Sequence, residues 1–249
     1  MPSLAAWARP GLTWAPGVLA RAGHFVLYYT ARDRVSDRQC IGRAVSASAA
    51  GPFVDDSSAP IVCQAAMGGS IDASPFLDAN GQPWLTWKND GNCCNLAVGL
   101  WSQRVSDDGR ELVGSPALIL SHDQAWESPL IEGSSMLATN GKYYLLYSAN
   151  WWESANYAVG YAVCDGPQGP CVKPKNGPIM AQRGAVAGPG GQAFFRDAAG
   201  KLWIAYHAWT APNTSYASGG ARGMRIDPIA IIDGVPQVSG PTAGPVTVD

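Results

Sequence analysis

Bulky apolar and small residues alternate in four separate segments, each of which begins at a turn glycine. The segments are residues 22–31 (AGHFVLYYTA), 80–89 (NGQPWLTWKN), 140–149 (NGKYYLLYSA) and 199–208 (AGKLWIAYHA). Alternation with a period of two residues is typical of β-strands. Pairs such as Asn80-Gly81 favour tight hairpin turns, because glycine accepts a positive φ. The pattern therefore predicts four strands, each preceded by a hairpin turn.

Further apolar stretches flank these segments and make the pattern a repeat. Shorter strands are predicted upstream at residues 13–20, 70–78, 130–138 and 188–197, and others downstream at 39–46, 157–163 and 224–232. The turn glycines Gly23, Gly81, Gly141 and Gly200 are 58, 60 and 59 residues apart. About four strands in each repeat is the content of a propeller blade, whereas a sandwich of short strands would not normally repeat at a fixed interval. We expect an all-β propeller with four blades and no substantial helix, forming one domain over residues 1–249.

One position of the repeat holds residues that could act in catalysis. The residues nine positions before the turn glycines are Trp14, Asp72, Glu132 and Gly191. Equivalent positions in a propeller point the same way, and two carboxylates that converge among apolar neighbours cost free energy unless they are paired or hydrogen-bonded. The alternative without catalysis is that Asp72 caps a local turn and that Glu132 lies on a solvated edge. The functional interpretation is acid–base chemistry on a glycosidic bond.

Charge and hydropathy exclude several partners. The net charge is −2 and only 14% of residues are charged, so no basic surface for nucleic acid or an acidic membrane is expected. No apolar run is long enough to span a bilayer. Ten tryptophans leave aromatic surface for a ligand.

The six cysteines favour disulfides and an oxidising compartment. They are Cys40, Cys63, Cys93, Cys94, Cys164 and Cys171. A zinc site is the rival, but no CxxC pair is present and only three histidines are available. Cys164 with Cys171, and Cys40 with Cys63, are the expected pairs, while Cys93 and Cys94 are either a vicinal bridge or two thiols. Residues 1–17 lack the apolar stretch and cleavage site of a signal peptide, so we expect a secreted protein whose chain here is incomplete at its N-terminus.

The inner-strand motifs resemble those of family-43 glycoside hydrolases. The segments TWAPGV, SIDASPF, IEGSSM and GPGGQAFF follow one another as successive blades of that family do. The resemblance implies a five-bladed propeller that hydrolyses arabinose- or xylose-containing polysaccharides with inversion. Asp72 matches the Asp of the family's I-D-P-S/A-type motif, which tunes the acid, and Glu132 matches the general acid of its E-G-P-type motif apart from the proline. Glu127 is a weaker candidate, because it is off the repeat register.

Two departures from the family pattern matter. The family's general base is an Asp in the first blade, and here the first acidic residue is Asp33, so the base and its blade are expected to be absent and activity to be impaired. If the chain were nevertheless fully active, another acid such as Asp33, Asp90 or Glu153 would act as base. Gly191 stands where many members place a histidine, so no metal is expected there, and His207 is expected to be a hydrogen-bonded core residue. No cofactor is expected.

Aromatic residues would form the sugar platform, since apolar sugar faces stack on rings. Trp14, Trp87 and Trp152 are the candidates, while Arg225 could either reach the centre or pair with Asp227. The expected partner is an oligo- or polysaccharide bound by a monomer. Two rivals to the enzyme remain open: a propeller that binds carbohydrate without cleaving it, and a structural or protein-binding propeller with incidental carboxylates.

Overall fold

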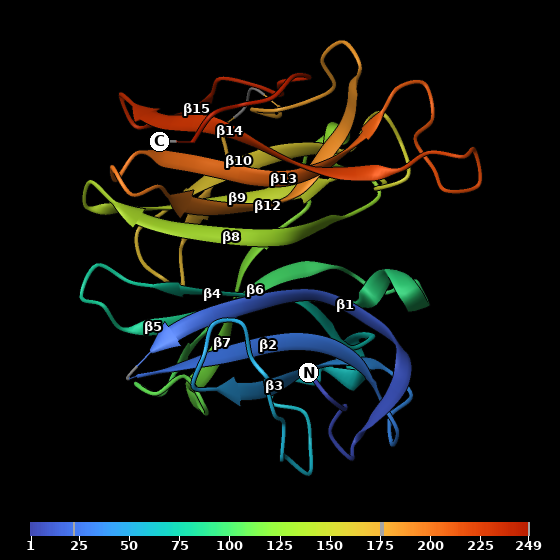
Figure 1. Cartoon of the computed structure of the whole chain (residues 1–249), viewed down its shortest axis with the longest axis vertical. Helices are drawn as coiled ribbons and strands as arrows, with labels where there is room; N and C mark the ends of the chain where they lie inside the picture. Colours follow the sequence, from blue (N-terminus) through green and yellow to red (C-terminus); the bar gives the residue numbers. More distant parts are fainter. Residues whose placement is uncertain (22, 175–176, 249) are drawn as a thin grey trace. The chain divides into compact units, whose positions relative to one another are not determined.

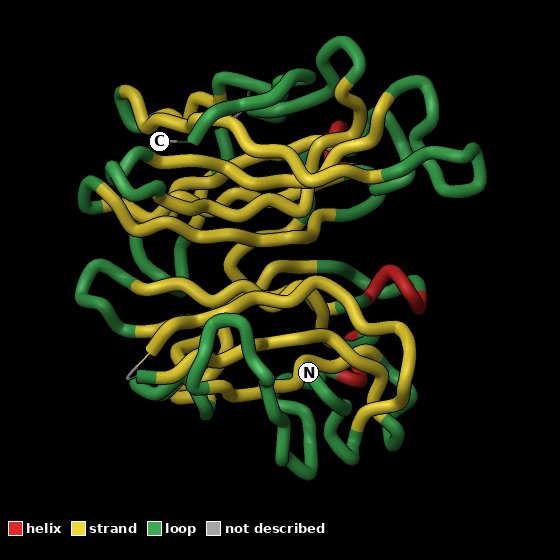
Figure 2. Tube along the Cα trace, viewed as in Figure 1, coloured by secondary structure: helices red, strands yellow, loops and turns green. Residues whose placement is uncertain are grey.

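Strands make up most of the chain (Figure 2). The computed structural model describes residues 1–21, 23–174 and 177–248, and this part of the chain forms fifteen strands in four sheets. Its helical segments are single 3-10 turns: η1 (Ala65–Met67), η2 (Gly91–Cys94) and η3 (Ala125–Glu127). Within these described residues, no helix has the length and apolar character needed to cross a bilayer.

The chain divides into two compact units. The first contains Met1–Ser121, Ala138–Gly141 and Asp165–Pro170, and the second contains His122–Leu137, Lys142–Cys164 and Cys171–Asp249. That the chain behaves as a single domain therefore stays a prediction.

The first unit holds two antiparallel sheets, drawn from blue to green in Figure 1. The first sheet has the order β1 (Ala8–Arg21), β2 (His24–Asp33), β3 (Gln39–Ser46). The second has the order β4 (Ser70–Leu77), β5 (Pro83–Asn89), β6 (Gly99–Val105), β7 (Leu112–Ser121). Buried side chains from both sheets, among them Tyr28, Ile41, Leu85 and Trp87, form one core cluster.

The second unit also holds two sheets. One has the order β11 (Cys171–Val172), β10 (Ala158–Cys164), β9 (Lys142–Ala149), β8 (Ile131–Thr139). The other has the order β12 (Val186–Arg196), β13 (Leu202–Thr210), β14 (Arg222–Ile232), β15 (Val235–Val238). Leu146, Val159, Ile204 and Tyr206 belong to the core cluster that the two sheets share.

The first sheet departs from the expected four strands. It contains three, and the place of a fourth is taken by isolated bridges that join Ile41 to Val62 and Val45 to Val54. Pro52 lies just before the first bridging residue, Val54, and Pro60 lies just before the second, Val62. Proline has no N–H to donate, so residues 52–62 do not form a continuous ladder.

The first strand of each sheet is irregular near the position that carries candidate chemistry. The pairing register shifts between Trp14 and Gly17 in β1, between Ile71 and Ser74 in β4, and between Gly190 and Ala193 in β12. Asp72, Gly133 and Gly191 have φ values of 58°, 57° and 61°. A β-bulge bends the strand and re-aims the side chains beside it. These strands therefore present the candidate residues from irregular backbone rather than from a regular pleat.

The described residues contain three disulfides. Cys40–Cys63 and Cys164–Cys171 are bridged, which confirms both expected pairs. Cys93 and Cys94 are bridged to each other, which answers the question that their adjacency left open. No free cysteine remains among the described residues.

Candidate active site

Glu132 lies near the start of β8 and is half-buried. The Tyr157 hydroxyl donates a hydrogen bond to Glu132 Oε1 at 2.8 Å. Tyr157 directly precedes β10 and is only 2% exposed, so its ring is fixed by packing. The structure therefore holds one carboxylate oxygen of Glu132 in a defined orientation.

A histidine ring lies against the ring of this tyrosine. The ring of Tyr157 stacks on His207 of β13, with centroids 5.8 Å apart and an interplanar angle of 9°. A Cβ on Gly190 would lie 2.1 Å from Tyr157 Cε1, and one on Gly191 would lie 2.7 Å from His207 Cδ2. The two glycines of β12 are therefore required for the stack, because any side chain there would displace a ring.

His207 is neutral at pH 7. Its pKa is lowered from 6.5 to about 4, chiefly by burial and also by the positive charge of Arg222, while the negative charge of Glu132 acts in the opposite direction. Its Nε2 lies 3.4 Å from Nη1 of Arg222, which can only donate. The neutral imidazole therefore accepts this hydrogen bond at Nε2 and carries its proton on Nδ1.

A buried polar network fixes the backbone beside Glu132. The Gly191 N–H donates to the Ser148 hydroxyl at 2.8 Å, and that hydroxyl donates to Gln192 Oε1 at 2.7 Å. The Gln192 amide then donates to the Gly133 carbonyl oxygen at 2.6 Å. Ser148 and Gln192 are 0% and 4% exposed, so these bonds are shielded from water and hold the two irregular strands at a fixed separation.

An aromatic cluster surrounds Arg222 at the start of β14. Its guanidinium lies 4.5 Å from the ring of Trp152, 5.6 Å from Tyr216 and 5.7 Å from Trp209. Trp209 is fully buried, while Tyr216 is 56% exposed. The cluster thus combines a cation with aromatic surface that is open to solvent, an arrangement suited to a polar ligand with apolar faces.

Asp72 and Trp14 lie in the other unit, Asp72 near the start of β4 and Trp14 in the middle of β1. Asp72 is half-buried and adopts a left-handed backbone conformation, which aspartate tolerates better than most residues. A Cβ on Gly17 would lie 2.6 Å from the Ala73 carbonyl oxygen, so β1 and β4 are in direct contact. Trp14 is 42% exposed, which leaves its indole available to a ligand.

Comparison with known proteins identifies the family. Residues 1–236 match the family model for glycosyl hydrolases family 43. The chain belongs to glycosyl hydrolase family 43. It shares 32% identity with a thermostable family-43 glycoside hydrolase of known structure, with a TM-score of 0.84 over 95% of this chain and 77% of that one. The expected fold class is confirmed: an all-β fold of the propeller type with four blades in this chain.

Two further relatives have more specific names. An endo-1,4-β-xylanase from Bacteroides thetaiotaomicron VPI-5482 has 32% identity and a TM-score of 0.76, over 92% of this chain and 75% of that one. A β-D-galactofuranosidase from Aspergillus niger is 27% identical over 215 residues, which are 81% of this chain and 58% of that protein. The family-43 chain therefore spans less than two thirds of the length of this curated relative.

One expected sugar-binding residue, Trp87, is buried, and another, Arg225, contacts the backbone of this chain. Trp87 is 1% exposed, and its indole N–H donates to Gln64 Oε1 at 2.7 Å, so it is a core residue with no face open to a sugar. Arg225 donates through Nη1 to the carbonyl oxygen of Thr242 at 3.2 Å and lies against the segment after β15. The part of Arg225 in sugar binding therefore stays a prediction. Trp152 lies against the exposed Tyr216 ring, and its role in sugar binding stays a prediction.

Glu127 has a structural role in this family-43 chain. It is fully buried, with Oε2 2.7 Å from Lys173 Nζ and Oε1 accepting from the Tyr147 hydroxyl at 2.6 Å. The backbone N–H groups of Asp123 and Gln124 also donate to Oε2. A carboxylate held by four donors in a closed site has no access to a substrate.

Two of the acids considered as substitute bases, Asp33 and Asp90, contact neighbouring groups of the protein. Burial would raise the pKa of Asp33, but hydrogen bonds from Ser36, together with the backbone N–H groups of Arg34 and Val35, outweigh it and lower that pKa. Asp90 is 5% exposed, with Oδ1 4.0 Å from Nζ of the fully buried Lys88. Both carboxylates are therefore engaged by neighbouring groups of the protein.

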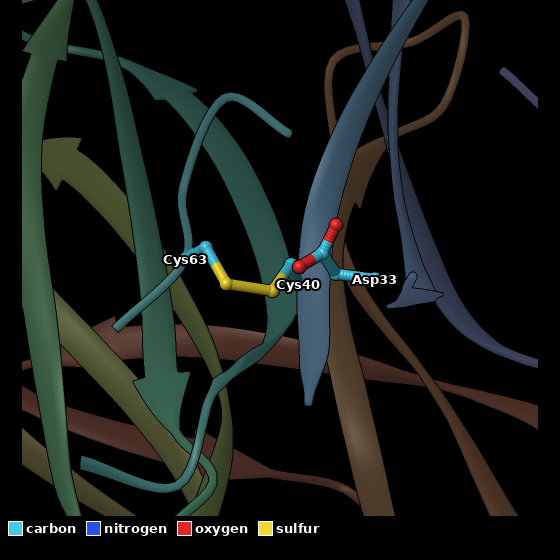
Figure 3. A group of neighbouring side chains, drawn as sticks. All are labelled: Asp33, Cys40 and Cys63. Atoms are coloured by element: carbon cyan, nitrogen blue, oxygen red, sulfur yellow. A yellow bond between two sulfur atoms is a disulfide. The ribbon is translucent and has the colours of Figure 1, made fainter. Parts of the chain in front are cut away.

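Asp33 also belongs to a cluster that resembles a metal site. Its carboxylate and the sulfurs of Cys40 and Cys63 lie within 4.8 Å of one another (Figure 3). Figure 3 shows that the two sulfurs are bonded to each other, so neither is a thiolate. Because thiolate is the form of cysteine that binds metals, the cluster as folded does not supply a soft metal's ligands.

Tyr157 and Arg222 were not identified from the sequence. Tyr157 directly precedes β10 and Arg222 begins β14; each of these is the third strand of its sheet and starts at the end where the first strand also begins. An aromatic or cationic residue at that place in each repeat is the signal that could have indicated them. The position nine residues before each turn glycine could not indicate them, because it locates only residues of the first strand.

Proposed function

We propose that this chain is an O-glycosyl hydrolase that acts on arabinose- or xylose-containing plant cell-wall polysaccharides with inversion. The observation that carries the proposal is the orientation of Glu132 by Tyr157 within a chain of family 43. A carboxyl group fixed in this way can direct its proton at one oxygen of a bound substrate. General acid catalysis requires that geometry before any other property.

The roles follow from the chemistry of inversion. Glu132 protonates the leaving glycosidic oxygen while a base removes a proton from the attacking water. A neighbouring negative charge favours the protonated form of a carboxylic acid, and Asp72 provides that charge. The proximity of Asp72 to Glu132 is a prediction, which a distance between their carboxyl groups in a crystal structure would test.

Sugar rings would pack on the open aromatic surfaces. Trp14 in one unit and Trp152 with Tyr216 in the other present these surfaces. Arg222 supplies N–H donors for hydroxyl groups next to the aromatic faces. This combination of apolar faces with few polar anchors is the usual composition of a carbohydrate site.

The proposed mechanism lacks an identified general base. The register position of the first sheet holds Trp14, and the first acidic residue, Asp33, is engaged by Ser36. We infer that the polypeptide of 249 residues lacks the family's general base and hydrolyses its substrate slowly. The same observation favours a second candidate function, in which the site binds a pentose polymer without cleaving it.

One experiment separates the two candidates. The chain is incubated with arabino- and xylo-oligosaccharides, NMR follows the anomer released, and calorimetry measures binding. Glu132→Gln should lower kcat by about 10² to 10⁴, because the substituted side chain has no proton to give. Glu111→Gln, which changes an acid in the other unit, is the matched control. Binding with no release of product by the native chain would favour the second candidate, and neither binding nor release would refute both.

Localisation and assembly are part of the proposal. Three disulfides favour an oxidising compartment, and a polysaccharide of the plant cell wall lies outside the cell. We therefore propose a secreted monomer. Analytical ultracentrifugation should find a species of about 26 kDa, in agreement with the mass of 26.1 kDa.

A further inference from the structure

The bridge between Cys93 and Cys94 lies at the surface of the first unit. The two residues end the turn η2, which follows β5, and Cys93 is exposed while Cys94 is half-exposed. The other two bridges differ, since Cys40 and Cys164 are both 0% exposed. The Cys93–Cys94 bridge therefore presents sulfur to solvent.

The turn that carries the bridge is rigidly held. The Asn89 side chain donates to the carbonyl oxygens of Met67 and Ala97 at 3.1 and 2.8 Å. It also accepts from the Gly99 N–H at 2.8 Å and from the Trp101 indole at 3.0 Å. Four hydrogen bonds from one side chain that is 1% exposed fix the segments on both sides of η2. A surface held in this way loses little conformational entropy when a ligand binds.

A cation lies against the sulfurs. Nη1 of Arg38 is 2.7 Å from Cys94 Sγ and 3.7 Å from Cys93 Sγ. Guanidinium has five N–H donors, so a contact through one nitrogen does not exhaust them. The site therefore combines a soft, weakly polar surface with hydrogen-bond donors at its edge.

The bridge lies at the end of the sheet where Asp72 is found. Ser70, two residues before Asp72, pairs with Asn89 at the end of β5, and η2 begins two residues later. From the neighbouring sheet, Gln39, which follows Arg38, donates to the Leu12 carbonyl oxygen at 2.9 Å. Leu12 and Trp14 are 51% and 42% exposed. Apolar side chains, sulfur and a guanidinium thus occur at the same end of adjoining strands.

We propose that the Cys93–Cys94 bridge and Arg38 form a subsite for a pentose unit of the polymer, at the end of the first unit's sheets where Asp72 lies. The proposal rests on the proposed function, which it deepens. The C–H face of the pentose packs on the two sulfurs, and Arg38 donates to its hydroxyl groups. This recognition applies to chains of several sugars and not to a single glycoside.

The test compares long and short ligands in calorimetry. The double variant Cys93→Ser/Cys94→Ser should raise Kd for a xylo- or arabino-hexasaccharide by about 5- to 20-fold, and leave Kd for the methyl pentoside within twofold. The control Cys164→Ser/Cys171→Ser removes a bridge from the other unit and should leave both values unchanged. Arg38→Gln, which keeps the bridge, should also weaken hexasaccharide binding selectively. If circular dichroism shows that the double variant is unfolded, Arg38→Gln alone tests the proposed subsite.

Each remaining outcome contradicts the inference in a recognisable way. If the native chain binds hexasaccharide and neither variant changes its Kd, the subsite is refuted while the proposed function stands. If the variants weaken long and short ligands equally, the bridge supports the main site and is not a subsite. If the native chain binds no pentose oligosaccharide, the proposed function itself fails.

Discussion

The Tyr157 hydroxyl connects the candidate acid to the rest of the second unit. It donates to Glu132, its ring stacks on His207, and His207 accepts from Arg222. Each of these side chains therefore affects Glu132 through the next one. A single substitution can change catalysis without touching the substrate.

Removal of the Tyr157 hydroxyl tests this connection. Tyr157→Phe should lower kcat by about tenfold and leave KM nearly unchanged, because it frees the orientation of the acid but removes no sugar contact. A hydrogen bond to a charged group is worth about 1.5–3 kcal/mol, and the lower value corresponds to about tenfold in rate. Steady-state kinetics on an aryl pentoside provides the measurement. Tyr161→Phe, in β10 and away from Glu132, is the control, and equal effects of both substitutions would argue for a loss of packing alone.

His207 predicts a dependence of stability on pH. Its pKa is about 4 in the folded chain, against an ordinary value of 6.5, so the unfolded chain binds more protons between these values. The free energy of unfolding should therefore fall as pH falls from 6.5 to about 4, and this contribution should level off below that range. One pKa unit corresponds to about 1.4 kcal/mol, so the loss is a few kcal/mol at most.

Urea unfolding at pH 7 and pH 5 measures this effect. His207→Gln keeps an acceptor for Arg222 but does not titrate, so the difference between the native chain and this variant isolates the histidine. The variant should lose less stability on acidification. Identical losses in both proteins would show that other groups govern the pH dependence.

Among the elements, the first strands of the sheets determine where the candidate residues point. Asp72 and Gly191 adopt positive φ at register shifts, and Gly133 does so directly after Glu132. Residues in sparsely populated backbone conformations cost free energy that regular strands do not. Their recurrence at corresponding places in three sheets indicates a requirement of the site rather than of the sheets.

A methyl group on β12 should disrupt the stack behind Glu132. Gly190→Ala places a Cβ 2.1 Å from Tyr157 Cε1, so the tyrosine must move. Overpacking of this kind costs about 1–3 kcal/mol, and the shift should also lower kcat. Gly223→Ala on β14 is the matched control, because a Cβ there meets no atom within 4 Å. Thermal unfolding and kinetics of both variants check the prediction, which fails if the two behave alike.

At the scale of the whole molecule, hydrolysis depends on whether the chain supplies every proton transfer. The first acidic residue, Asp33, accepts a hydrogen bond from Ser36, and the register position of β1 is a tryptophan. Glu132, the proposed acid, is held by Tyr157, whereas no residue is proposed as the base. The molecule should therefore bind substrate better than it cleaves it.

Added azide distinguishes this deficiency from simple inactivity. The 249-residue polypeptide should release product slowly in buffer, since loss of a base typically costs about 10² to 10⁴ in rate. Azide needs no deprotonation, so it should displace the leaving group, accept the glycosyl unit and raise the rate of leaving-group release. Product analysis should find the glycosyl azide. Full activity without azide would mean that Asp33, Asp90 or Glu153 serves as base, and the corresponding Asn or Gln substitutions would identify it.

Much of the fold was already determined by local sequence patterns. The predicted strand at residues 39–46 coincides with β3, and the hairpins around Gly81 and Gly141 form as expected. Alternation of bulky and small residues reports which face of a strand is buried, and turn glycines report where the chain reverses. Both signals lie within a few residues, so they need no knowledge of the tertiary structure. The three-stranded first sheet was missed, because its prolines act on long-range pairing.

The repeat register located Asp72 and Glu132 as candidates, but only the tertiary structure decided what surrounds such residues. Trp14 and Trp87 look alike in sequence, yet one is 42% exposed and the other is 1% exposed. Glu127 became a buried ion pair with Lys173, 46 residues away, and Tyr157 reached Glu132 across 25 residues. Burial and side-chain contacts depend on segments that are distant along the chain. A sequence by itself therefore determines which residues could act, whereas the packing of distant strands decides which of them can reach a substrate.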